Sequence, residues 1–366
     1  MGSCISAIGT ANPGNRIAQR DILEYMIRSH GLEGGDARRL RSLYTRSGID
    51  HRYSVLRDFD AENVPFSPLF FEDDRGWKKP GTAERQEKYR QHAVEVGTEA
   101  VKNCLSMETA AEITHLITVS CTGMYAPGLD IDLIEKLGLN RNTERICINF
   151  MGCYGAVNAL KTADYICRAE ASARVLIVSV ELCTLHFQPD NTTDNWVANS
   201  LFSDGAAAVV VEPFSPGKNG LEIKTFYAEY IHDARDEMGW YIGDTGFNMQ
   251  LTAEVPAQIG KHIAGLTQKL GVKTAPSDVP LRYAIHPGGK KILDVAEEAL
   301  GFPAEMNDAS RAVLREYGNM SSATILFVLE KLMRSGLDPG EQVAAFAFGP
   351  GLTVESMLLE NHGENG

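Results

Sequence analysis

Cys153 is the residue whose local sequence points most directly to chemistry. It lies in Gly152-Cys153-Tyr154-Gly155, where an apolar, β-branched stretch ends and an amphipathic helical pattern begins. A helix N-terminus presents free amide N–H groups and the positive end of the helix dipole, so it can lower the pKa of a cysteine below its usual value of about 8.5. Most cysteines of globular proteins are buried structural thiols. The flanking glycines, which allow a tight turn and close approach of a substrate, favour a nucleophile at Cys153.

Two further residues could act together with such a nucleophile. His286 ends a predicted strand and is followed by Pro287-Gly288-Gly289, a turn that can point the imidazole into a pocket as proton donor or as imidazolium partner of a thiolate. Asn319 precedes an apolar helical run, where asparagine is ordinarily an N-cap. Its amide could instead donate to a developing oxyanion. Taken alone, each of the two is more often structural, and only Cys153 makes them candidates.

The order Cys, His, Asn is also that of papain-like proteases, in which the histidine follows the cysteine by roughly 130–150 residues. Cys153 and His286 are 133 residues apart. A papain-type site, however, has a second cysteine and an aromatic residue around a nucleophile near the mature N-terminus. Only Gly152-Cys153-Tyr154 fits that signature here, so the spacing alone supports the protease interpretation.

The elements that must position these residues follow from the apolar pattern. Short apolar, β-branched runs bounded by turn residues predict buried strands at 116–120, 146–150, 175–180, 206–211, 283–285 and 343–348, and the first ten residues read as a further short strand. Helical patterns lie between them, with Ala156, Leu160, Ala163 and Cys167 on one face and Ile292, Ala296, Ala299 and Leu300 on another. Alternating strands and helices predict an α/β protein.

The length of 366 residues exceeds the size at which one hydrophobic core usually stops growing, which predicts two core units. The loop 212–220 contains two prolines and two glycines and is the best candidate boundary. We therefore expect an N-terminal half, 1–213, that carries the nucleophile and a C-terminal half, 214–366, that carries the histidine and the asparagine.

The two halves also have similar spacing. Cys121 ends a predicted strand 32 residues before Cys153, and His286 ends one 33 residues before Asn319. Such matched spacing suggests duplicated αβ units whose loops converge on one site.

Composition excludes several other classes of protein. No apolar run approaches the roughly 20 residues of a membrane span, and the formal net charge of -13, without a basic stripe, argues against a nucleic-acid partner. The start of the chain lacks the basic leader and long apolar region of a secretory signal, so the cytoplasm is the expected compartment. Seven cysteines without CxxC spacing predict free, mostly buried thiols, and neither disulfides nor a metal site.

Five sequence blocks form a more specific combination. They are Met151-Gly152-Cys153, residues 201–208 (LFSDGAAA), His286-Pro287-Gly288-Gly289, Tyr317-Gly318-Asn319-Met320-Ser321-Ser322 and residues 348–355 (FGPGLTVE). In order and spacing they resemble the type III polyketide synthases, the chalcone synthase-like family of the thiolase superfamily. The resemblance covers nearly the whole chain and is bacterial rather than plant in detail.

This resemblance implies a thiolase-like layered αβαβα fold built from two similar halves, and a homodimer with two independent sites. It implies Cys153 as nucleophile and acyl carrier, with His286 and Asn319 binding the thioester carbonyl. The implied reaction is iterative decarboxylative condensation of malonyl-CoA onto an acyl-CoA starter, followed by cyclisation to a pyrone or to a resorcinol or phloroglucinol-type product. No permanently bound cofactor is implied. A deprotonated Cys153 paired with protonated His286 would accept the starter without another base.

The resemblance also implies the residues around the reaction centre. Phe202 matches a gating aromatic whose ring would exclude charge and favour decarboxylation, and Met249 stands where the family has a second gating phenylalanine. The remaining implied pocket residues are Cys121, Ala126, His186, Phe247, Ser321, Gly349 and Pro350. Because Cys121 and Ala126 differ from the usual plant residues, and a larger methionine that reaches across the dimer is replaced by Ala126, we expect a wider or longer cavity, suited to a fatty acyl starter.

For the coenzyme A phosphates, Arg39 and Arg46 match two of three basic residues of the family. Ser42 stands at the third position, where Arg41 could substitute. Lys291 could add a further contact. Arginines and lysines of an exposed helix are often only solvated, and that reading stays open.

Two other functions remain as alternatives. An initiating 3-ketoacyl-acyl-carrier-protein synthase shares this fold and this chemistry but takes its extender from a carrier protein. The His286-Pro287-Gly288-Gly289 block and the block beginning at Phe348 favour the polyketide synthase, although Ala347 departs from the family pattern. A binding protein without activity is possible on the same fold, and the intact Cys-His-Asn set argues against it.

Overall fold

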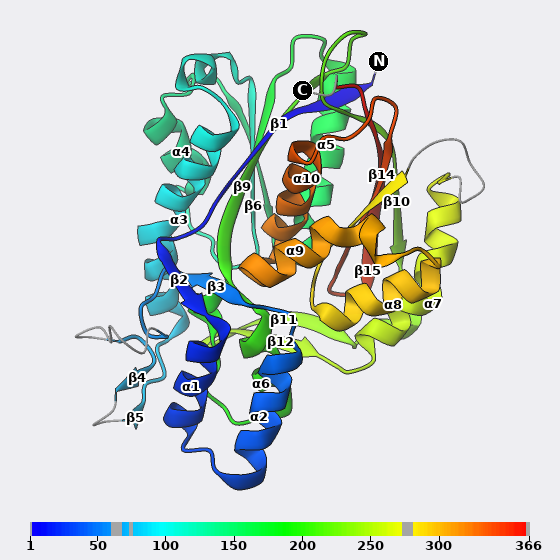
Figure 1. Cartoon of the computed structure of the whole chain (residues 1–366). Coiled ribbons are helices and arrows are strands. Elements are labelled where there is room, and N and C mark those ends of the chain that lie inside the picture. Colours follow the sequence, from blue (N-terminus) through cyan, green and yellow to red (C-terminus); the bar gives the residue numbers. More distant parts are fainter. Residues whose placement is uncertain (1, 60–67, 73–75, 273–280, 364–366) are drawn as a thin grey trace.

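The computed structural model describes residues 2–59, 68–72, 76–272 and 281–363. Within them, nine strands form one mixed sheet (Figure 1). These strands are β1 (Ser3–Ala11), β6 (His115–Ser120), β7 (Glu144–Asn149), β8 (Val175–Leu182), β9 (Asp204–Pro213), β10 (Leu221–Tyr230), β13 (Leu281–Ile285), β14 (Gln342–Gly349) and β15 (Thr353–Asn361). Their order across the sheet is β13-β14-β15-β10-β1-β9-β8-β6-β7. β6 is parallel to β7 and β8, and β13 is parallel to β14.

Short antiparallel pairs complete the strands. They are β2 (Asn15–Ala18) with β3 (His51–Ser54), β4 (Phe71–Glu72) with β5 (Gly76–Trp77), and β11 (Met238–Gly243) with β12 (Gly246–Leu251). The helices are α1 (Gln19–His30), α2 (Gly34–Arg46), α3 (Thr82–Cys104), α4 (Leu129–Leu137), α5 (Gly155–Ala169), α6 (Thr193–Leu201), α7 (Val255–Lys269), α8 (Lys290–Leu300), α9 (Asp308–Tyr317) and α10 (Thr324–Arg334).

The elements are arranged in five layers. Helices α5 and α10 lie in the middle, between the two halves of the sheet, while α3 and α4 cover one outer face and α7 and α8 cover the other (Figure 1). In α10 the consecutive residues from Ile325 to Leu329 are all buried, as a helix that is apolar on every side requires. This is the thiolase-like αβαβα arrangement that the sequence blocks imply.

Most of the predicted elements are confirmed. Five of the six predicted strand runs lie inside the buried strands β6, β8, β9, β13 and β14. The two predicted helical faces belong to α5 and α8, and the Gly349-Pro350-Gly351 turn connects β14 to β15. Apart from Met1, which lies outside the described residues, the first ten residues form most of β1.

The prediction of a buried strand at 146–150 is wrong in its burial. Residues 146–149 of that run belong to β7, which among the described residues pairs only with β6 at the edge of the sheet and is exposed along most of its length. Ile146 is 37% exposed, and Cys147, predicted to be a buried thiol, is exposed as well. An apolar run indicates side chains that are shielded from water, but it does not show whether the same chain or another molecule shields them.

The division into halves at residue 213 stays a prediction. β9 ends at Pro213 and β10 begins at Leu221, but β1 of the first half lies between β9 and β10 and pairs with both, so one sheet joins the two halves. Among the described residues, no helix combines the length and the apolar character needed to cross a membrane.

Gly9 marks where β1 passes directly beneath α3. A Cβ atom at this position would lie 2.2 Å from the backbone nitrogen of Cys104 and 2.4 Å from the backbone carbon of Asn103. Because backbone atoms of a buried helix cannot step aside cheaply, we expect Gly9→Ala to lower the free energy of unfolding by about 3 kcal/mol. Gly14→Ala, with no atom within 4 Å of its Cβ position, should change it by less than about 0.5 kcal/mol. Equal urea midpoints for the two variants would contradict this packing.

Candidate active site

Cys153 lies in the wall of a cavity. The cavity has about 70 Å³ of free volume, and its surface is mostly apolar. The expected pocket residues that line it are Cys121, His186, Phe202, Phe247, Met249, Ser321 and Pro350. Two expected residues do not line it: Ala126 is exposed on the surface, and Gly349 lies behind Cys153. A volume with room for only a handful of water-sized groups gives no support to the wider cavity that we expected.

The loop that carries Cys153 is a tight turn followed at once by a helix. Cys153 is in the short 3₁₀ turn η2 (Gly152–Tyr154), directly before α5, and it is buried. Gly152 has a left-handed φ of 79°, and a Cβ atom there would lie 2.2 Å from Cδ of Pro350. A Cβ atom on Gly349 would lie 3.3 Å from the Cys153 nitrogen. The turn between β14 and β15 therefore packs against the cysteine loop, and both contacting positions need glycine.

Asn319 connects this loop to the one that follows His286. Its side-chain Nδ2 donates to the Gly288 carbonyl (3.2 Å), and its amide is also within hydrogen-bonding reach of the Cys153 sulfur. Its Oδ1 accepts from the Ser321 N–H (2.9 Å). The capping role and the functional role proposed from the sequence are thus compatible, because they use different atoms of the amide.

Backbone pairing fixes Asn319 relative to Phe202. The Asn319 N–H donates to the Leu201 carbonyl and the Ser203 N–H donates to the Asn319 carbonyl, each at 2.9 Å, on either side of Phe202. Ser321 next to this pair has a left-handed φ of 47°, which is costly for a residue with a side chain. Its hydroxyl is within hydrogen-bonding reach of the Cys153 sulfur, so the strained position brings a polar group to the nucleophile.

His286 is fully buried at the end of β13, and neither of its ring nitrogens has a hydrogen-bond partner among the described residues. Its backbone N–H continues the pairing with β14 by donating to the Phe346 carbonyl (2.8 Å). Its Nε2 lies 3.7 Å from the position that a Cβ on Gly288 would take, so the ring folds back over the same residue that accepts from Asn319. Buried polar nitrogens without partners cost about 1–3 kcal/mol each, and a bound substrate group could satisfy them.

Burial keeps both reacting groups neutral. It raises the pKa of the Cys153 thiol to about 12, although hydrogen bonds from Ser321 and Asn319 act in the opposite direction; the nearby Glu181 carboxyl raises the pKa further. Burial lowers the pKa of His286 to about 3. The expectation that the helix N-terminus lowers the cysteine pKa is therefore wrong for this structure, because loss of solvent outweighs it. A neutral thiol and a neutral imidazole replace the expected ion pair.

Glu181 is a buried residue of the site that the sequence analysis missed. It lies in β8 and accepts hydrogen bonds from the Cys121 N–H (3.0 Å), the Thr122 hydroxyl (2.9 Å) and the Ser322 hydroxyl. Through these donors it holds the end of β6 against the turn that follows Asn319. Burial raises its pKa. A single carboxylate in an otherwise apolar strand was the signal that could have identified it.

His186 is held in one neutral tautomer and belongs to the cavity wall. Its Nδ1 accepts from the Phe247 N–H (3.0 Å), and its Nε2 donates to the Thr122 carbonyl (2.7 Å). The ring stacks on Phe247 at a centroid distance of 4.0 Å. Burial lowers its pKa to about 3, so His186 shapes the pocket and is not placed to exchange protons.

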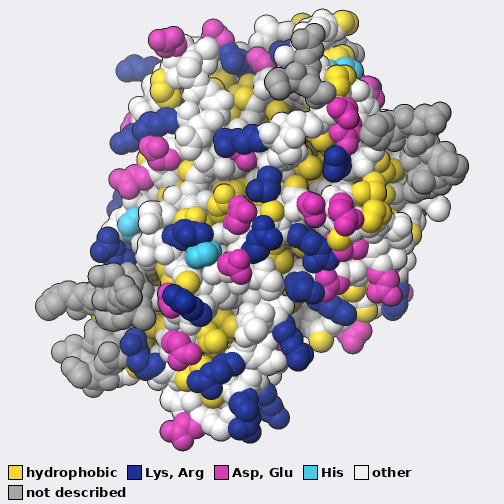
Figure 2. Space-filling model, in the orientation of Figure 1, with side chains coloured by type: hydrophobic (Ala, Val, Ile, Leu, Met, Phe, Trp, Pro, Cys, Tyr) yellow, Lys and Arg dark blue, Asp and Glu magenta, His cyan; other side chains and the backbone are white. Residues whose placement is uncertain are grey.

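The three cations expected to bind phosphate do not line this cavity. Arg39, in α2, is exposed and lies 3.5 Å from Asp36, while Arg46 ends α2 and Lys291 lies in the first turn of α8, both exposed. The side chain of Lys290 is 3.4 Å from the Cβ position of Gly48, so the end of α2 and the start of α8 are adjacent. Figure 2 shows Lys and Arg side chains gathered over the lower end of this face, where Figure 1 draws α2.

Comparisons with known proteins agree with this fold and site. The N-terminal domain of chalcone and stilbene synthases matches residues 2–213, and the C-terminal domain of the same proteins matches residues 222–362. The chain therefore belongs to the chalcone and stilbene synthase family of type III polyketide synthases, acyltransferases that use coenzyme A thioesters.

Individual relatives are similar over nearly their whole length. The 1,3,6,8-tetrahydroxynaphthalene synthase of Streptomyces peucetius subsp. caesius is 34% identical over 98% of this chain and 93% of its own. The alpha-pyrone synthesis polyketide synthase-like Pks18 of Mycobacterium tuberculosis is 31% identical over 97% of this chain and 90% of its own. The solved C-terminal type III polyketide synthase domain of Steely1 from Dictyostelium is 27% identical, with a TM-score of 0.88 and 99% of both chains covered.

The raised thiol pKa predicts how Cys153 reacts with iodoacetamide. Only the thiolate is alkylated, so well below the pKa the rate should rise about tenfold per pH unit, from about pH 6 to at least about pH 9. Peptide mass spectrometry would follow Cys153, with a small-molecule thiol in the same mixture as the reagent control. The same profile is expected in His286→Gln. A wild-type rate that is already at its plateau near pH 7 would instead indicate a thiolate–imidazolium pair.

Proposed function

We propose that Cys153 takes an acyl group from a CoA thioester and that the chain extends it with malonyl-CoA by iterative decarboxylative Claisen condensation. One observation carries this proposal: the Cys153 sulfur, in the wall of an apolar cavity, lies within reach of the Asn319 amide. The same amide binds the Gly288 carbonyl, and the His286 ring, whose nitrogens have no partner among the described residues, is folded over Gly288. The polar group of Asn319 is thus adjacent to the nucleophile, and the partnerless imidazole adjoins the residue that the Asn319 amide binds, which supports a common role for the three.

Acyl loading needs one base, and neutral His286 can supply it. As the Cys153 sulfur attacks the starter carbonyl, the thiol proton moves to the imidazole. Collapse of the tetrahedral adduct then breaks the bond to CoA, and the CoA thiolate takes the proton back from the imidazolium. The result is an acyl thioester on Cys153 and free CoA, with the imidazole neutral again.

Chain extension uses the same donors without Cys153 as a base. With the thioester carbonyl of malonyl-CoA against His286 and Asn319, loss of CO₂ leaves an enolate whose oxygen these donors stabilise. The enolate carbon attacks the acyl thioester, and Cys153 leaves as the thiolate. Apolar Phe202 and Met249 in the cavity wall disfavour a carboxylate there, which supports decarboxylation.

The released chain would cyclise to a pyrone or to a resorcinol or phloroglucinol-type ring. Two bacterial relatives, one named for alpha-pyrone synthesis and one for the synthesis of a tetrahydroxynaphthalene, support products of this kind. The turn at Gly349 and Pro350 packs on the nucleophile loop and would limit how the growing chain folds.

We further propose that Arg46 and Lys291, with Arg39, bind the CoA phosphates at the surface. Their support is electrostatic: the end of α2 adjoins the start of α8, and two or three cations there attract a small polyanion locally even on an acidic protein, because charges more than about 10 Å away are screened.

The competing function is an initiating synthase that takes its extender from a carrier protein. Incubation with malonyl-CoA and acyl-CoA starters, with no carrier protein present, separates the two. The preferred function predicts CO₂ release and condensed products under these conditions. Their absence, together with activity restored by a malonyl-loaded carrier protein, would favour the competitor.

The roles of the three residues predict that their variants lose different activities. Cys153→Ala should abolish condensed product yet keep malonyl-CoA decarboxylation, because the enolate needs only His286 and Asn319. His286→Ala and Asn319→Ala should each lower decarboxylation about 100-fold or more. Cys167→Ala, a buried cysteine of the same helix α5 that points into the core, is the matched control and should retain activity. Condensation by Cys153→Ala would contradict the assignment.

We also propose that two chains form a homodimer through β7. The outer edge of this strand has no partner among the described residues, and the exposed apolar side chains Met124, Ile146 and Met151 lie on it or on the loops beside it. Unpaired edges with apolar side chains favour association with another strand, and a two-fold axis would pair the same patch on both subunits. Exposed Ala126 lies close to Met124 in sequence, consistent with a loop that faces the partner.

A charge at the edge strand should separate the subunits. Ile146→Glu would bury two carboxylates close together in the interface, so light scattering on a sizing column should show the mass of one chain. Tyr230→Glu, at an exposed residue of β10 (51%), should keep twice that mass. A wild-type chain that is monomeric at micromolar concentration, or an Ile146→Glu variant that stays dimeric, would refute this interface.

A further inference from the structure

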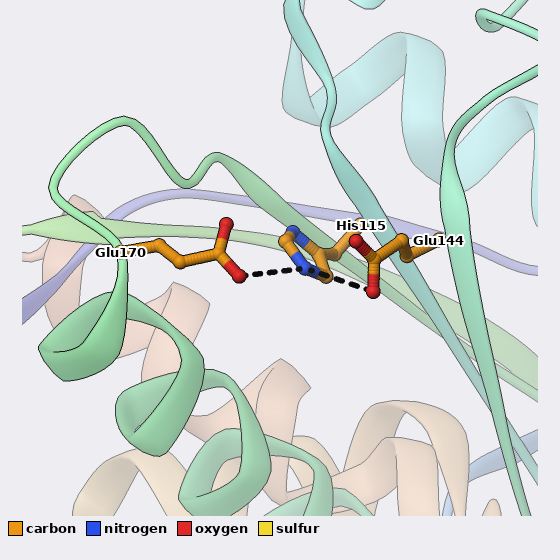
Figure 3. Close-up of side chains that lie close together, drawn as sticks. All are labelled: His115, Glu144 and Glu170. Carbon is orange, nitrogen blue, oxygen red and sulfur yellow. Dashed lines mark ion pairs between the residues drawn. The ribbon is translucent and has the colours of Figure 1, made fainter.

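His115, Glu144 and Glu170 lie close together, with both carboxylates near the imidazole (Figure 3). His115 begins β6 and is paired in register with Glu144, which begins β7. Glu170 is the residue directly after α5. Since β6 and β7 run in parallel toward the cysteine loop, about six residues of strand, or roughly 20 Å, separate this cluster from Cys153.

The imidazole of His115 is buried and directed at the two carboxylates. Its side chain is only 6% exposed, and its Nε2 lies 3.7 Å from Oε2 of Glu144 and 3.9 Å from Oε1 of Glu170. These separations are too long for hydrogen bonds. Within the described residues, no lysine or arginine lies within ion-pair distance of either carboxylate. A buried nitrogen and two acidic oxygens therefore face one another across a gap.

The hydroxyl of Thr114 indicates which nitrogen of His115 carries hydrogen. This oxygen is 2.8 Å from His115 Nδ1, 2.9 Å from the Arg174 backbone nitrogen and 3.2 Å from the Arg174 carbonyl oxygen. All three contacts are satisfied at once if the hydroxyl accepts from Nδ1–H and from the Arg174 N–H and donates to the carbonyl. Hydrogen on Nδ1 leaves the Nε2 lone pair free whenever the ring is neutral.

We propose that His115, Glu144 and Glu170 bind a divalent transition-metal ion, Zn²⁺ being the best match. Metal–nitrogen and metal–oxygen bonds of about 2.0–2.2 Å place tetrahedral ligand atoms about 3.4 Å apart. The three ligand atoms here already lie within 4.8 Å of one another. The carboxylates have side chains that are 73% and 52% exposed, so they can move through the remaining distance of at most about 1.4 Å, and water can complete the coordination.

The ligand set selects the kind of ion. An imidazole nitrogen with two carboxylates suits Zn²⁺, Mn²⁺ or Co²⁺, whereas Mg²⁺ and Ca²⁺ prefer oxygen alone. The hydrogen bond from His115 Nδ1–H to Thr114 orients the ring, as partners of metal-bound histidines usually do.

A second cluster of a histidine and two glutamates contains a lysine, which the first cluster lacks. Glu222, Glu360 and His362 also gather potential ligand atoms, but Nζ of Lys224 lies 2.9 Å from Glu222 and 3.6 Å from Glu360. His362 Nε2 already lies 2.8 Å from Glu222. An ammonium ion occupies the position of a metal there, so that cluster is neutralised and serves as an internal control.

A bound ion would join β6, the edge strand β7 and the end of α5 at one point. It would stabilise the start of β7, which otherwise has a single neighbouring strand. At about 20 Å from Cys153 it would not contact substrate, so this inference does not depend on the proposed reaction.

Chelator-treated full-length protein would be titrated with Zn²⁺ by calorimetry and with Co²⁺ by visible absorption. We expect one equivalent to bind and, at a free concentration about 100-fold above Kd, a rise in Tm of about 3–5 °C. Glu144→Gln and Glu170→Gln, both at exposed side chains, should each weaken binding about tenfold or more, and the double variant should bind none at this site. His362→Gln should bind as the wild type does.

Three outcomes would overturn the proposal. The first is no stoichiometric binding of Zn²⁺ or Co²⁺ by the wild type up to about 1 mM, which would leave only a histidine–carboxylate ion pair. The second is binding that is unchanged in the double variant, since the ion would then sit on other groups such as the free thiols. The third is a rise in Tm on addition of Zn²⁺ that is the same in the folded double variant as in the wild type. Unfolded variants are recognised by their circular dichroism, and Glu170→Gln alone then decides.

Discussion

The amide of Asn319 holds the reaction centre together. Its nitrogen binds the Gly288 carbonyl in the loop after His286 and reaches the sulfur of Cys153, while its oxygen caps the turn that carries Ser321. These residues come from distant parts of the chain, and each is fixed by its own element: β13 for the histidine, η2 and α5 for the cysteine, and the pairing with residues 201 and 203 for the asparagine. The middle layer of α5 and α10 makes this possible, because both helices begin at the same buried place.

Burial then decides the chemistry of the pair. Removing water from Cys153 and His286 favours the neutral form of each, and the buried Glu181 carboxyl adds to this at the thiol. A neutral imidazole can accept the thiol proton during attack and can afterwards present a hydrogen to an enolate oxygen. A permanent imidazolium would do only the second. The low-polarity surroundings therefore suit the two successive roles that we propose for His286.

The sequence predicted those features that arise from local pattern. The periodicity of apolar residues and the positions of turn residues predict the buried strands, the helices α5 and α8, and the turn at Pro350. The role of Cys153 was suggested by its glycines, but the pKa was predicted in the wrong direction, because the helix dipole can be read from the sequence and desolvation cannot. For the same reason β7 was predicted to be buried: an apolar run does not show which molecule covers it. Glu181 and the group around His115 were missed because their partners are brought close only by sheet register, as for Glu144 opposite His115.

The edge strand β7 links the two proposals that lie outside the reaction. Its last residue, Asn149, leads directly through Met151 to the cysteine loop, and its first residue, Glu144, faces His115. Like β13 at the other edge, β7 has one neighbouring strand among the described residues, so it has about half the backbone hydrogen bonds of an interior strand and its position is less constrained. A partner chain along its outer edge would supply the missing backbone bonds, and an ion at its start would fix its register. Both constraints would act on the strand that delivers the nucleophile, although neither touches the substrate, and this explains why a strand so exposed in one chain can still carry a precisely placed cysteine at its end.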